Sequence, residues 1–554
     1  MREGCCRVCS RGFYSCHWRH SHGMGSKRAC WWFSFVAVAF LLSLCWMYIW
    51  LVSFNDREDV NWKMFQHLKR WVNWFMVVIV VSAVLTSYCT LLLLFALFQV
   101  ALGEQLNLHW LHKIFLFFGA IIITCMIAGI CLVWPQEWPT IPLSLQATAP
   151  FLHFGAVGAL TLLSLFVFQR FHTAKKGSMF LIAMFLVVSA AILLCPLWIQ
   201  SPCLIKMEEL PEKPKLIGHR GAPMLAPENT MMSFNRSVEC GVTVFETDVQ
   251  LSKNRVPFLM HDNGSEFLLR TTNVQERFPN KTFNNSTEIT FKELRSLNAG
   301  EWFLKTDPFH SVSQLSDDER KTARSQTIPS LHDLLDLAKQ HNISVLFDLY
   351  SPNQKNDARD TEDIVKTISE SGINQNLVLW LPPATRNMTP PGFIQIYNNE
   401  KAMREENGSH LNVKYSALSM GKIRNLTKEN YTVNLYVVNE RWLFSLLWCA
   451  GASSVTTNAC HLLKDVDEPD WVLDPFIYKI IWISVDIVSV VIMMGLYIFE
   501  RKTHCFCHRE EPNRDSTPIC NGKEMDPHSS SPLLPPFLRY QSGVDQSQRE
   551  SRLA

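Results

Sequence analysis

The sequence has no excess of charge of either sign. Among its 554 residues, 52 Lys and Arg stand against 50 Asp and Glu, which gives a formal net charge of +2 at pH 7. Proteins that hold nucleic acid by its phosphate backbone carry a marked basic excess. The balanced charge therefore argues against nucleic acid as a partner.

Charged residues are also nearly absent from six long apolar runs, at residues 31–54, 75–100, 114–134, 147–169, 179–199 and 478–499. A helix across the bilayer needs about 20 apolar residues, so each run is long enough. The 24 residues of the first run exceed the ~7–15 of the apolar part of a signal peptide, which favours a membrane span. Residues 31–200 are thus predicted to hold five transmembrane helices and residues 478–499 a sixth.

Asp486 is the only acidic residue inside these runs. A charge at the bilayer centre costs about 2.5–3.5 kcal/mol on insertion scales, so we expect its side chain to face other helices or water. A single acidic residue is little for a substrate pathway and argues against a transporter. The histidines near span ends, His109, His112 and His153, are expected to be interfacial or lipid-facing.

Lys and Arg residues flank the runs unevenly. They gather before residue 31, at residues 170–176 and at residues 501–502, all on one side of a six-span arrangement. The positive-inside rule makes that side cytosolic, although four basic residues in the loop 55–74 run against it. We therefore predict cytosolic termini and an extracellular or lumenal domain at residues 204–475, in the plasma membrane or another secretory-pathway membrane.

Ten N-x-Ser/Thr sequons give an independent signal for this orientation. All lie in residues 204–475, at Asn235, Asn263, Asn280, Asn284, Asn285, Asn342, Asn387, Asn407, Asn425 and Asn430. Glycosylation occurs in secreted regions, so the clustering favours an exoplasmic domain. Asn235 falls in a helix-like segment, where burial would leave it unmodified.

The 17 cysteines divide between compartments under this topology. Four lie in the exoplasmic region: Cys203, Cys240, Cys449 and Cys460. Oxidising conditions permit disulfides there, and four cysteines allow three pairings. For the cysteines of the basic segment 1–30 and of the tail 500–554, zinc binding, acylation and free cytosolic thiols all remain open. The tail is rich in Ser, Pro, Arg and Gln and is predicted to be disordered.

Strand-like and helix-like segments alternate from residue 213 onward. Eight strands are predicted, at residues 216–218, 244–249, 257–260, 344–349, 377–381, 393–397, 433–438 and 454–456. This alternation is typical of a parallel sheet with crossover helices, and eight strands fit a (β/α)₈ TIM barrel. Residues 262–327 break the pattern and predict an insertion over the barrel mouth with a short helix near 291–297. Ser330 and Asp333 predict the capped start of a helix.

Two polar motifs follow the first predicted strand. His219 and Arg220 end it, and there the imidazole can move protons while the guanidinium holds two phosphate oxygens. Glu228 and Asn229 lie just before a helix-like segment. They serve either as helix caps or as part of a site, and the sequence leaves both roles open.

Further polar residues stand on the next two predicted strands. Glu246 and Asp248 project from one face of a strand because side chains alternate with period two, which outlines a site for a hard cation. His261 closes the third predicted strand and can either transfer protons or bind a metal. Barrel enzymes build active sites at the C-terminal ends of their strands, so these groups are expected to meet.

Taken in order, the motifs His219-Arg220-Gly221, Pro227-Glu228-Asn229-Thr230, Glu246-x-Asp248 and His261-Asp262 resemble the glycerophosphodiester phosphodiesterase family. The resemblance covers about residues 214–463, and the six-span setting resembles a membrane branch of that family. It implies Asp348 as a further acidic ligand, so that Glu246, Asp248 and Asp348, with His261 as an alternative ligand, would hold Ca²⁺ or Mg²⁺. It also implies Arg220, His219, His261 and Glu228 as the catalytic set.

Two positions depart from the family pattern. Tyr350 stands where Lys is usual, which removes a positive charge that helps the phosphate, and Asn458 replaces an acid, where we expect a structural consequence only. The preferred hypothesis is a membrane-bound phosphodiesterase acting at the exoplasmic face on a glycerophosphodiester of choline, inositol, ethanolamine or a glycolipid anchor, in contact with membrane lipid. The alternative is a catalytically weak barrel that serves as a signalling or adhesion module.

Overall fold

The structure is a computed structural model and describes residues 12–16, 27–68, 72–101, 106–173, 178–261, 265–281, 285–349 and 357–509. Several predictions fall outside these ranges: those on most of the basic N-terminal segment, Asp262, Asn263, Asn284, Tyr350 and the tail beyond residue 509.

Five described helices are long and apolar enough to cross a membrane. They are α2 (Lys27–Tyr48), extended by the π-helical turn η1 (Ile49–Ser53), α4 (Trp74–Ala101), α5 (Trp110–Val133), α6 (Thr140–Thr173) and α20 (Pro475–Arg509). The run predicted at residues 179–199 forms a shorter apolar helix, α7 (Ser178–Leu194), followed by the 3-10 turn η3 (Cys195–Trp198). The prediction of a multi-pass helical membrane protein is confirmed.

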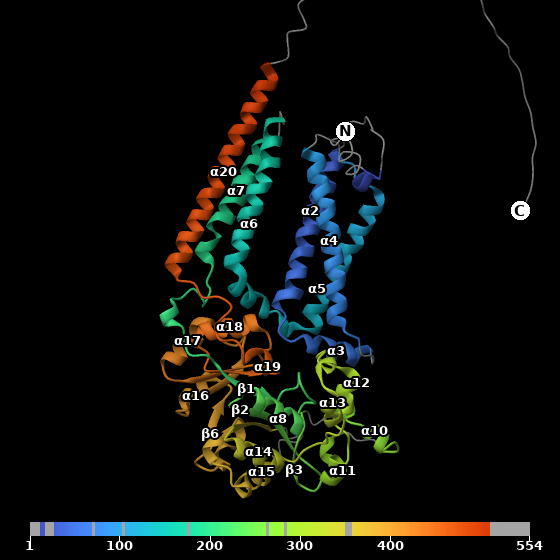
Figure 1. Ribbon diagram of the computed structural model, residues 1–554, viewed down its shortest axis with the longest axis vertical. Helices are drawn as coiled ribbons and strands as arrows, with labels where there is room; N and C mark the ends of the chain where they lie inside the picture. The colour runs from blue at the N-terminus through green and yellow to red at the C-terminus, as the bar shows by residue number, and fades with distance from the viewer. Residues whose placement is uncertain are drawn as a thin grey trace, which may run out of the picture. The chain divides into compact units, whose positions relative to one another are not determined.

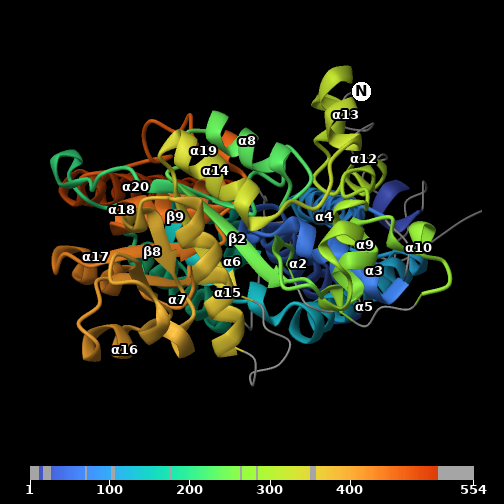
Figure 2. The ribbon, with the colours of Figure 1, turned by 90° about the horizontal axis from the view of Figure 1, so that it is seen from below.

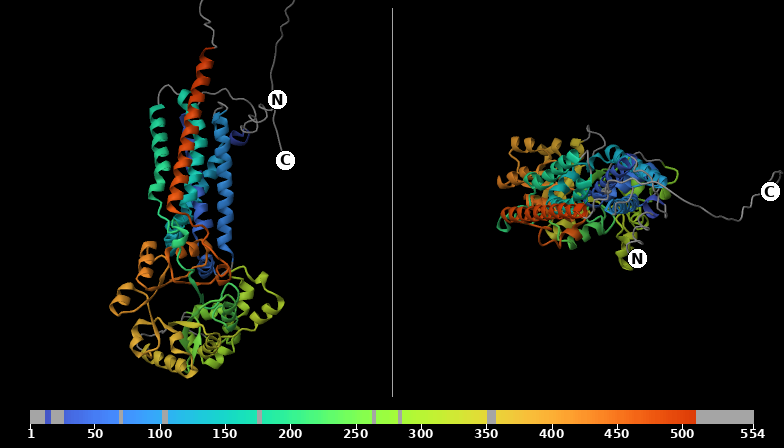
Figure 3. Two further views of the ribbon diagram at one scale, coloured as in Figure 1. Left: turned by 60° about the vertical axis from the view of Figure 1, so that its left-hand side comes forward. Right: turned by 90° about the horizontal axis from the view of Figure 1, so that it is seen from above.

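The apolar helices pack in two groups, which are visible in Figure 1, and Figure 3 shows the same helices from other sides. Helices α2, α4 and α5 share one buried cluster that includes Leu92 and Leu116, and α6, α7 and α20 share another that includes Leu160 and Met493. Between α6 and α20, His153 Nε2 lies 3.6 Å from Asp486 Oδ1. Asp486 therefore faces another helix as expected, whereas the prediction that His153 is interfacial or lipid-facing is wrong because the residue is only 2% exposed.

Eight parallel strands close into a barrel: β1 (Lys215–His219), β2 (Val244–Leu251), β4 (Ser344–Leu349), β5 (Val378–Trp380), β6 (Ile394–Tyr397), β7 (His410–Lys414), β8 (Thr432–Tyr436) and β9 (Ser454–Thr457). Each pairs in parallel with its neighbour, and β1 pairs with both β2 and β9, which closes the ring. The predicted TIM barrel is confirmed.

Two details of the strand prediction are wrong. The segment predicted at residues 257–260 forms β3 (Pro257–Leu259), but β3 runs antiparallel to β2, with Val249 opposite Leu259, and is not a barrel strand. The eighth barrel strand is instead β7, which the prediction missed. Only Leu411 and Val413 in β7 are apolar, and its central Asn412 is buried. A short strand with a polar residue in its middle gives a weak signal.

Helices surround the strands and bury the apolar core between the two layers. They are α8 (Met231–Glu239), α14 (Leu331–His341), α15 (Asp357–Ser371), α16 (Glu400–Glu405), α17 (Met420–Lys428), α18 (Arg441–Ala450) and α19 (Cys460–Leu463), as Figure 2 shows. Phe234 of α8 packs edge-on against Phe245 of β2, and both are fully buried. Helix α14 begins with the predicted capping box of Ser330 and Asp333.

The insertion after β3 is more ordered than its polar sequence suggests. It forms α9 (Ser265–Thr271), α10 (Val274–Arg277), α11 (Phe291–Arg295), α12 (Glu301–Thr306) and α13 (Asp317–Arg324). Helix α11 matches the predicted short helix. Buried residues of the insertion such as Leu268 and Leu294 form a small core together with Phe258 of β3, and Figure 2 shows the insertion's helices beside the barrel.

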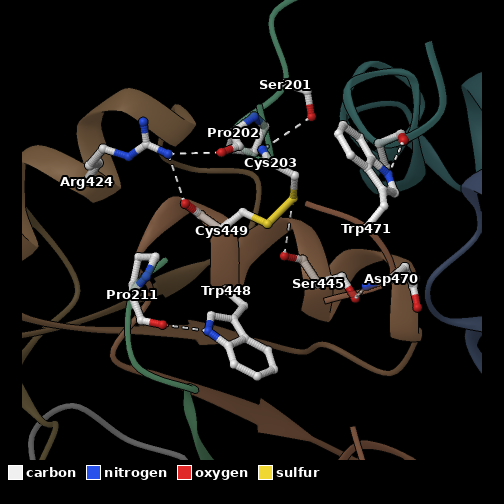
Figure 4. Close-up of a disulfide and its surroundings, with 11 residues drawn as sticks. Ser201, Pro202, Cys203, Pro211, Arg424, Ser445, Trp448, Cys449, Asp470 and Trp471 are labelled. Carbon is white, nitrogen blue, oxygen red and sulfur yellow. Dashed lines mark hydrogen bonds between the residues drawn. A yellow bond between two sulfur atoms is a disulfide. The ribbon is translucent and has the colours of Figure 1, made fainter. Parts of the chain in front are cut away.

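Two disulfides select one of the three possible pairings, Cys203 with Cys449 and Cys240 with Cys460. Figure 4 shows the first, which ties the segment entering the barrel to α18. Arg424 supports this junction by donating to the carbonyls of Pro202 and Cys449, at 3.0 and 2.9 Å. Nearby, the indole of Trp471 donates to the carbonyl of Ala147 in α6, at 2.9 Å, so the barrel and the apolar helices are in contact.

Candidate active site

A cavity of about 750 Å³ opens at the C-terminal ends of the barrel strands. Its walls include six of the seven predicted site residues: His219, Arg220, Glu246, Asp248, His261 and Asp348. The seventh, Glu228, lies directly behind Arg220, to which it is hydrogen-bonded. The structure therefore brings these seven predicted site residues together.

The turn after β1 depends on an unusual backbone conformation. Arg220 and Gly221 both lie in the left-handed region, with φ of 54° and 88°. A Cβ on Gly221 would lie 2.6 Å from the backbone carbon of Ser233, so only glycine fits where the turn meets α8. The turn brings the Arg220 backbone N–H within 3.0 Å of Glu246 Oε2, to which it donates a hydrogen bond. Such strained residues cluster at functional sites.

Arg220 is held by carboxylates on two sides. Its Nη1 donates to Glu228 Oε2 at 2.9 Å, and its Nε lies 3.3 Å from Asp248 Oδ2. Glu228 also accepts a hydrogen bond from Arg270 at 2.6 Å. Although burial alone would raise it, the guanidinium groups of Arg270 and Arg220 lower the pKa of Glu228 to about 2. Glu228 is thus a charged partner of Arg220, and the helix N-cap is Thr230 instead.

Three carboxylates share the floor of the cavity. Glu246 and Asp248 lie two residues apart on β2, and Asp348 of β4 is directly opposite Asp248 in the parallel register. Burial, and then repulsion from Asp248, raise the pKa of Glu246 well above its usual value and that of Asp348 to about 6. This concentration of negative charge and oxygen donors fits a hard divalent cation. As they stand, no three described His, Cys, Asp or Glu side chains converge closely enough to enclose one.

His219 has one ring nitrogen fixed and the other directed at the carboxylates. Its Nδ1 lies 2.6 Å from Asn458 Oδ1, and its Nε2 lies 3.9 Å from Glu246 Oε2. Because an amide oxygen only accepts, Nδ1 carries the proton and Nε2 keeps a lone pair. Burial and the neighbouring Arg220 charge lower the pKa of His219 to about 3, so the ring is neutral at pH 7. It can accept a proton from a bound hydroxyl group.

His261 reaches the site by a route that the sequence did not predict. The β2–β3 hairpin carries the chain back alongside β2, so that the Met260 N–H donates to the Asp248 carbonyl at 3.0 Å. His261 Nε2 then lies 4.0 Å from Asp248 Oδ1. The histidine is therefore placed by an antiparallel return rather than by the end of a barrel strand. Its role, proton transfer or metal binding, stays a prediction.

Several residues around the site were missed or misjudged from the sequence. Asn458, expected to have a structural role only, contacts His219 directly. Arg270 belongs to no motif, yet from helix α9 of the insertion it forms an ion pair with Glu228. Asp56 also lines the cavity. It precedes helix α3 (Arg57–Leu68), in a segment predicted as a loop between spans. Contacts between segments so far apart in the sequence leave no local sequence pattern. Only the presence of Asn458 in place of the family's acidic residue marked one of these positions as unusual.

Comparison with known proteins gives consistent results. Residues 219–380 match the sequence profile of the Glycerophosphoryl diester phosphodiesterase family. A mouse protein named Glycerophosphoinositol inositolphosphodiesterase GDPD2 is 43% identical over 510 residues, which cover 89% of this chain and 94% of the mouse protein. A chicken (Gallus gallus) protein named Glycerophosphodiester phosphodiesterase domain-containing protein 5 is 39% identical over 507 residues, which cover 89% of this chain and 84% of the chicken protein.

Proposed function

Because this chain belongs to the glycerophosphoryl diester phosphodiesterase family and is a phosphodiesterase, we propose that it hydrolyses a glycerophosphodiester with the help of a divalent metal at the exoplasmic face of a membrane. The convergence of His219, Arg220, Glu246, Asp248, His261 and Asp348 on one cavity is the observation that carries the proposal.

Glu246, Asp248 and Asp348 would hold the cation, Ca²⁺ or Mg²⁺, with His261 as an alternative ligand. Enzymes of this family generally depend on a divalent metal. The raised pKa values of Glu246 and Asp348 support this assignment, because a bound cation would offset both causes of the shift, the burial of the carboxylates and their repulsion from Asp248. When bound, such a cation offsets the negative charge of the phosphate and orients it.

The protein's own side chains supply phosphate binding and proton transfer. The Arg220 guanidinium, kept in place by Glu228 and Asp248, binds phosphate oxygens. His219, oriented through Nδ1 by Asn458, takes the proton of the attacking glycerol hydroxyl or water at Nε2. His261 gives a proton to the leaving alcohol when it does not act as a ligand. In this scheme His219 takes up one proton and His261 supplies the other.

The family indicates the substrate class, a glycerophosphodiester. The head group of that substrate is a narrower proposal. The mouse relative's name specifies glycerophosphoinositol. A cavity of about 750 Å³ falls within the ~300–1,000 Å³ usual for small-molecule sites, which suits a whole glycerophosphodiester. We propose glycerophosphoinositol first and the choline, ethanolamine and glycolipid-anchor diesters as alternatives.

A substrate panel tests this proposal. The full-length protein in membranes is assayed against glycerophosphodiesters of inositol, choline and ethanolamine, with Ca²⁺, Mg²⁺ or a chelator. We expect hydrolysis of at least one diester that the chelator abolishes and the metal restores. Metal-independent turnover would overturn the metal assignment, and lack of turnover on every diester would favour the signalling or adhesion module.

A further inference from the structure

The segment between the first two apolar helices reaches into the barrel domain. It runs from Asn55 through helix α3 and connects η1 to α4. Asp56 lines the active-site cavity, while Asn55 on one side and Trp62 on the other contact residues that lead to the catalytic groups. Each of these contacts joins the membrane region to the barrel at its catalytic end.

Asn55 connects the segment to His219. Only 2% exposed, Asn55 donates through Nδ2 to the Val437 carbonyl at 2.7 Å and accepts through Oδ1 from the Asn439 N–H at 2.9 Å. The side chain of Asn439 accepts from the Asn458 N–H at 2.9 Å, and Asn458 in turn bonds His219 Nδ1 at 2.6 Å. Removing Asn55 would leave the Val437 carbonyl and the Asn439 N–H buried without these hydrogen bonds, which costs free energy. We expect the loop after β8 to move so that both groups find other partners.

Trp62 connects the same segment to Arg220. Its ring lies 4.4 Å from the Arg270 guanidinium, which also stacks on Phe267 and Trp302 at 4.7 and 5.0 Å. The Arg270 side chain is only 9% exposed and binds Glu228, which binds Arg220. The cation–π attraction of a guanidinium held over aromatic rings is stronger at a partly desolvated site than at the exposed surface. The membrane segment thus supplies one wall of the pocket that fixes the Glu228–Arg220 pair.

We propose that the segment 55–62 is an integral part of the active site, in which Asn55 and Trp62 are positioning residues for His219 and Arg220. This inference rests on the proposed function, since it assigns the two chains of contacts to proton transfer and to phosphate binding. Arg57 adds a third attachment next to the first chain, an ion pair with Glu440 at 2.9 Å. Two series of contacts run independently from this short segment to the adjacent residues His219 and Arg220. Attachment of the barrel to the membrane region would not need both.

The Asn55 chain is tested by kinetics on the full-length protein. Asn55→Ala is expected to lower kcat by roughly 10–100-fold with KM changed by less than about twofold, because the loss falls on the general base. Asn55→Asp keeps an acceptor for the Asn439 N–H but sets a buried carboxylate oxygen against the Val437 carbonyl, so it is expected to lower kcat at least as much as Asn55→Ala. Arg57→Ala removes the ion pair between the half-exposed Arg57 side chain and Glu440 and is expected to lower kcat by a smaller factor.

The Trp62 chain is tested by phosphate binding as well as by kinetics. Trp62→Ala is expected to raise KM at least about fivefold and to reduce the rise in Tm that inorganic phosphate produces, since Arg220 loses its support. Trp62→Phe keeps an aromatic face under Arg270 and is expected to restore most of both. His67→Ala, an exposed position on the same helix, is the matched control and is expected to behave as wild type.

Wild-type kinetics per folded molecule in Asn55→Ala, Arg57→Ala and Trp62→Ala would overturn the inference, even if Tm or abundance fell, because the segment would then be only an attachment. Equal changes in His67→Ala would overturn it too. If the wild-type protein hydrolysed no glycerophosphodiester, the proposed function would fail, yet phosphate binding would still decide this inference: an unchanged phosphate effect in Trp62→Ala would reject it.

Discussion

Gly221 is the residue on which the shape of the site most depends. Its φ of 88° and its close approach to α8 let the chain reverse after β1, so that Arg220 lies over Glu246. Gly241 offers a comparison within the same chain, because it has a similar φ of 73° but open space within 4 Å of the place that a Cβ would occupy. The two glycines therefore separate backbone conformation from steric contact.

Gly221→Ala is expected to destabilise the protein by more than Gly241→Ala does. A left-handed conformation alone costs an alanine about 1–2 kcal/mol, and only position 221 adds a clash with backbone atoms that cannot move aside. Thermal unfolding of the two full-length variants measures the difference. Equal melting temperatures would show that the turn after β1 tolerates a side chain.

Asp348 and Glu246 would give the proposed metal site a pH dependence. Their raised pKa values mean that protons occupy these carboxyl groups at acid pH, and Asp348 releases its proton near pH 6. Protons and the cation compete for the same oxygens. The apparent affinity for Ca²⁺ or Mg²⁺ should therefore rise as the pH increases through about 6 and fall as the pH decreases below it. Titration calorimetry at several pH values checks this, and a pH-independent affinity would exclude Asp348 as a ligand.

Sequence alone predicted the site residues at strand ends and Glu228, which supports Arg220, but it missed the supporting residues on distant segments. His219, Glu246 and Asp348 follow from period-two alternation, from the position of barrel sites and from the family's motifs, all of which are read from short stretches of chain. Asn55 and Arg270 reach the site only through tertiary contacts with distant segments. The role of Asn458 was misjudged for the same reason, because its hydrogen bond to His219 joins the two ends of the barrel domain.

At the scale of elements, the antiparallel hairpin β2–β3 is the feature that most changes the expected arrangement. Eight strands were predicted and eight form the barrel, but β3 was counted where β7 belongs. Strand propensity indicates that a segment forms a strand, but not which strand it pairs with or in which direction. An apolar segment that returns antiparallel in a hairpin therefore has the same sequence pattern as a barrel strand. The hairpin keeps His261 next to Asp248 even so.

The disulfide between Cys203 and Cys449 is an element-scale device with a measurable effect. It joins positions 246 residues apart and fixes the segment entering the barrel to α18. Removing a native disulfide of this kind typically costs about 2–5 kcal/mol. The double variant Cys203→Ser/Cys449→Ser should therefore melt several degrees below Cys45→Ser, which replaces an exposed free cysteine of α2. Identical melting curves for the two would mean that the bond does not stabilise the fold.

At the scale of the whole molecule, the ten sequons test which side of the membrane the barrel occupies. Seven of their asparagines are exposed in the structure: Asn235, Asn280, Asn342, Asn387, Asn407, Asn425 and Asn430. The exposure of Asn235 corrects the suggestion that burial leaves it unmodified. Every sequon in the described residues therefore lies in the barrel domain, on the side that we propose to be exoplasmic.

Treating the full-length protein from mammalian cells with an N-glycanase should increase its gel mobility. Such glycans are added only on the exoplasmic side, so the shift reports orientation directly. A variant carrying Asn→Gln at all ten sequons is the control and should not shift. A wild-type protein that migrates identically before and after treatment would reverse the proposed orientation.

The most direct test of the whole account is metal-dependent hydrolysis by the full-length protein and two of its variants. Glu246→Gln and His219→Ala are compared with wild type in membranes, on the glycerophosphodiester that the wild type turns over fastest. We predict that Glu246→Gln, folded and inserted, loses metal-dependent turnover, and that His219→Ala loses roughly 10²–10⁴-fold in kcat. Turnover that survives in both variants would contradict the assignment of this cavity as the active site.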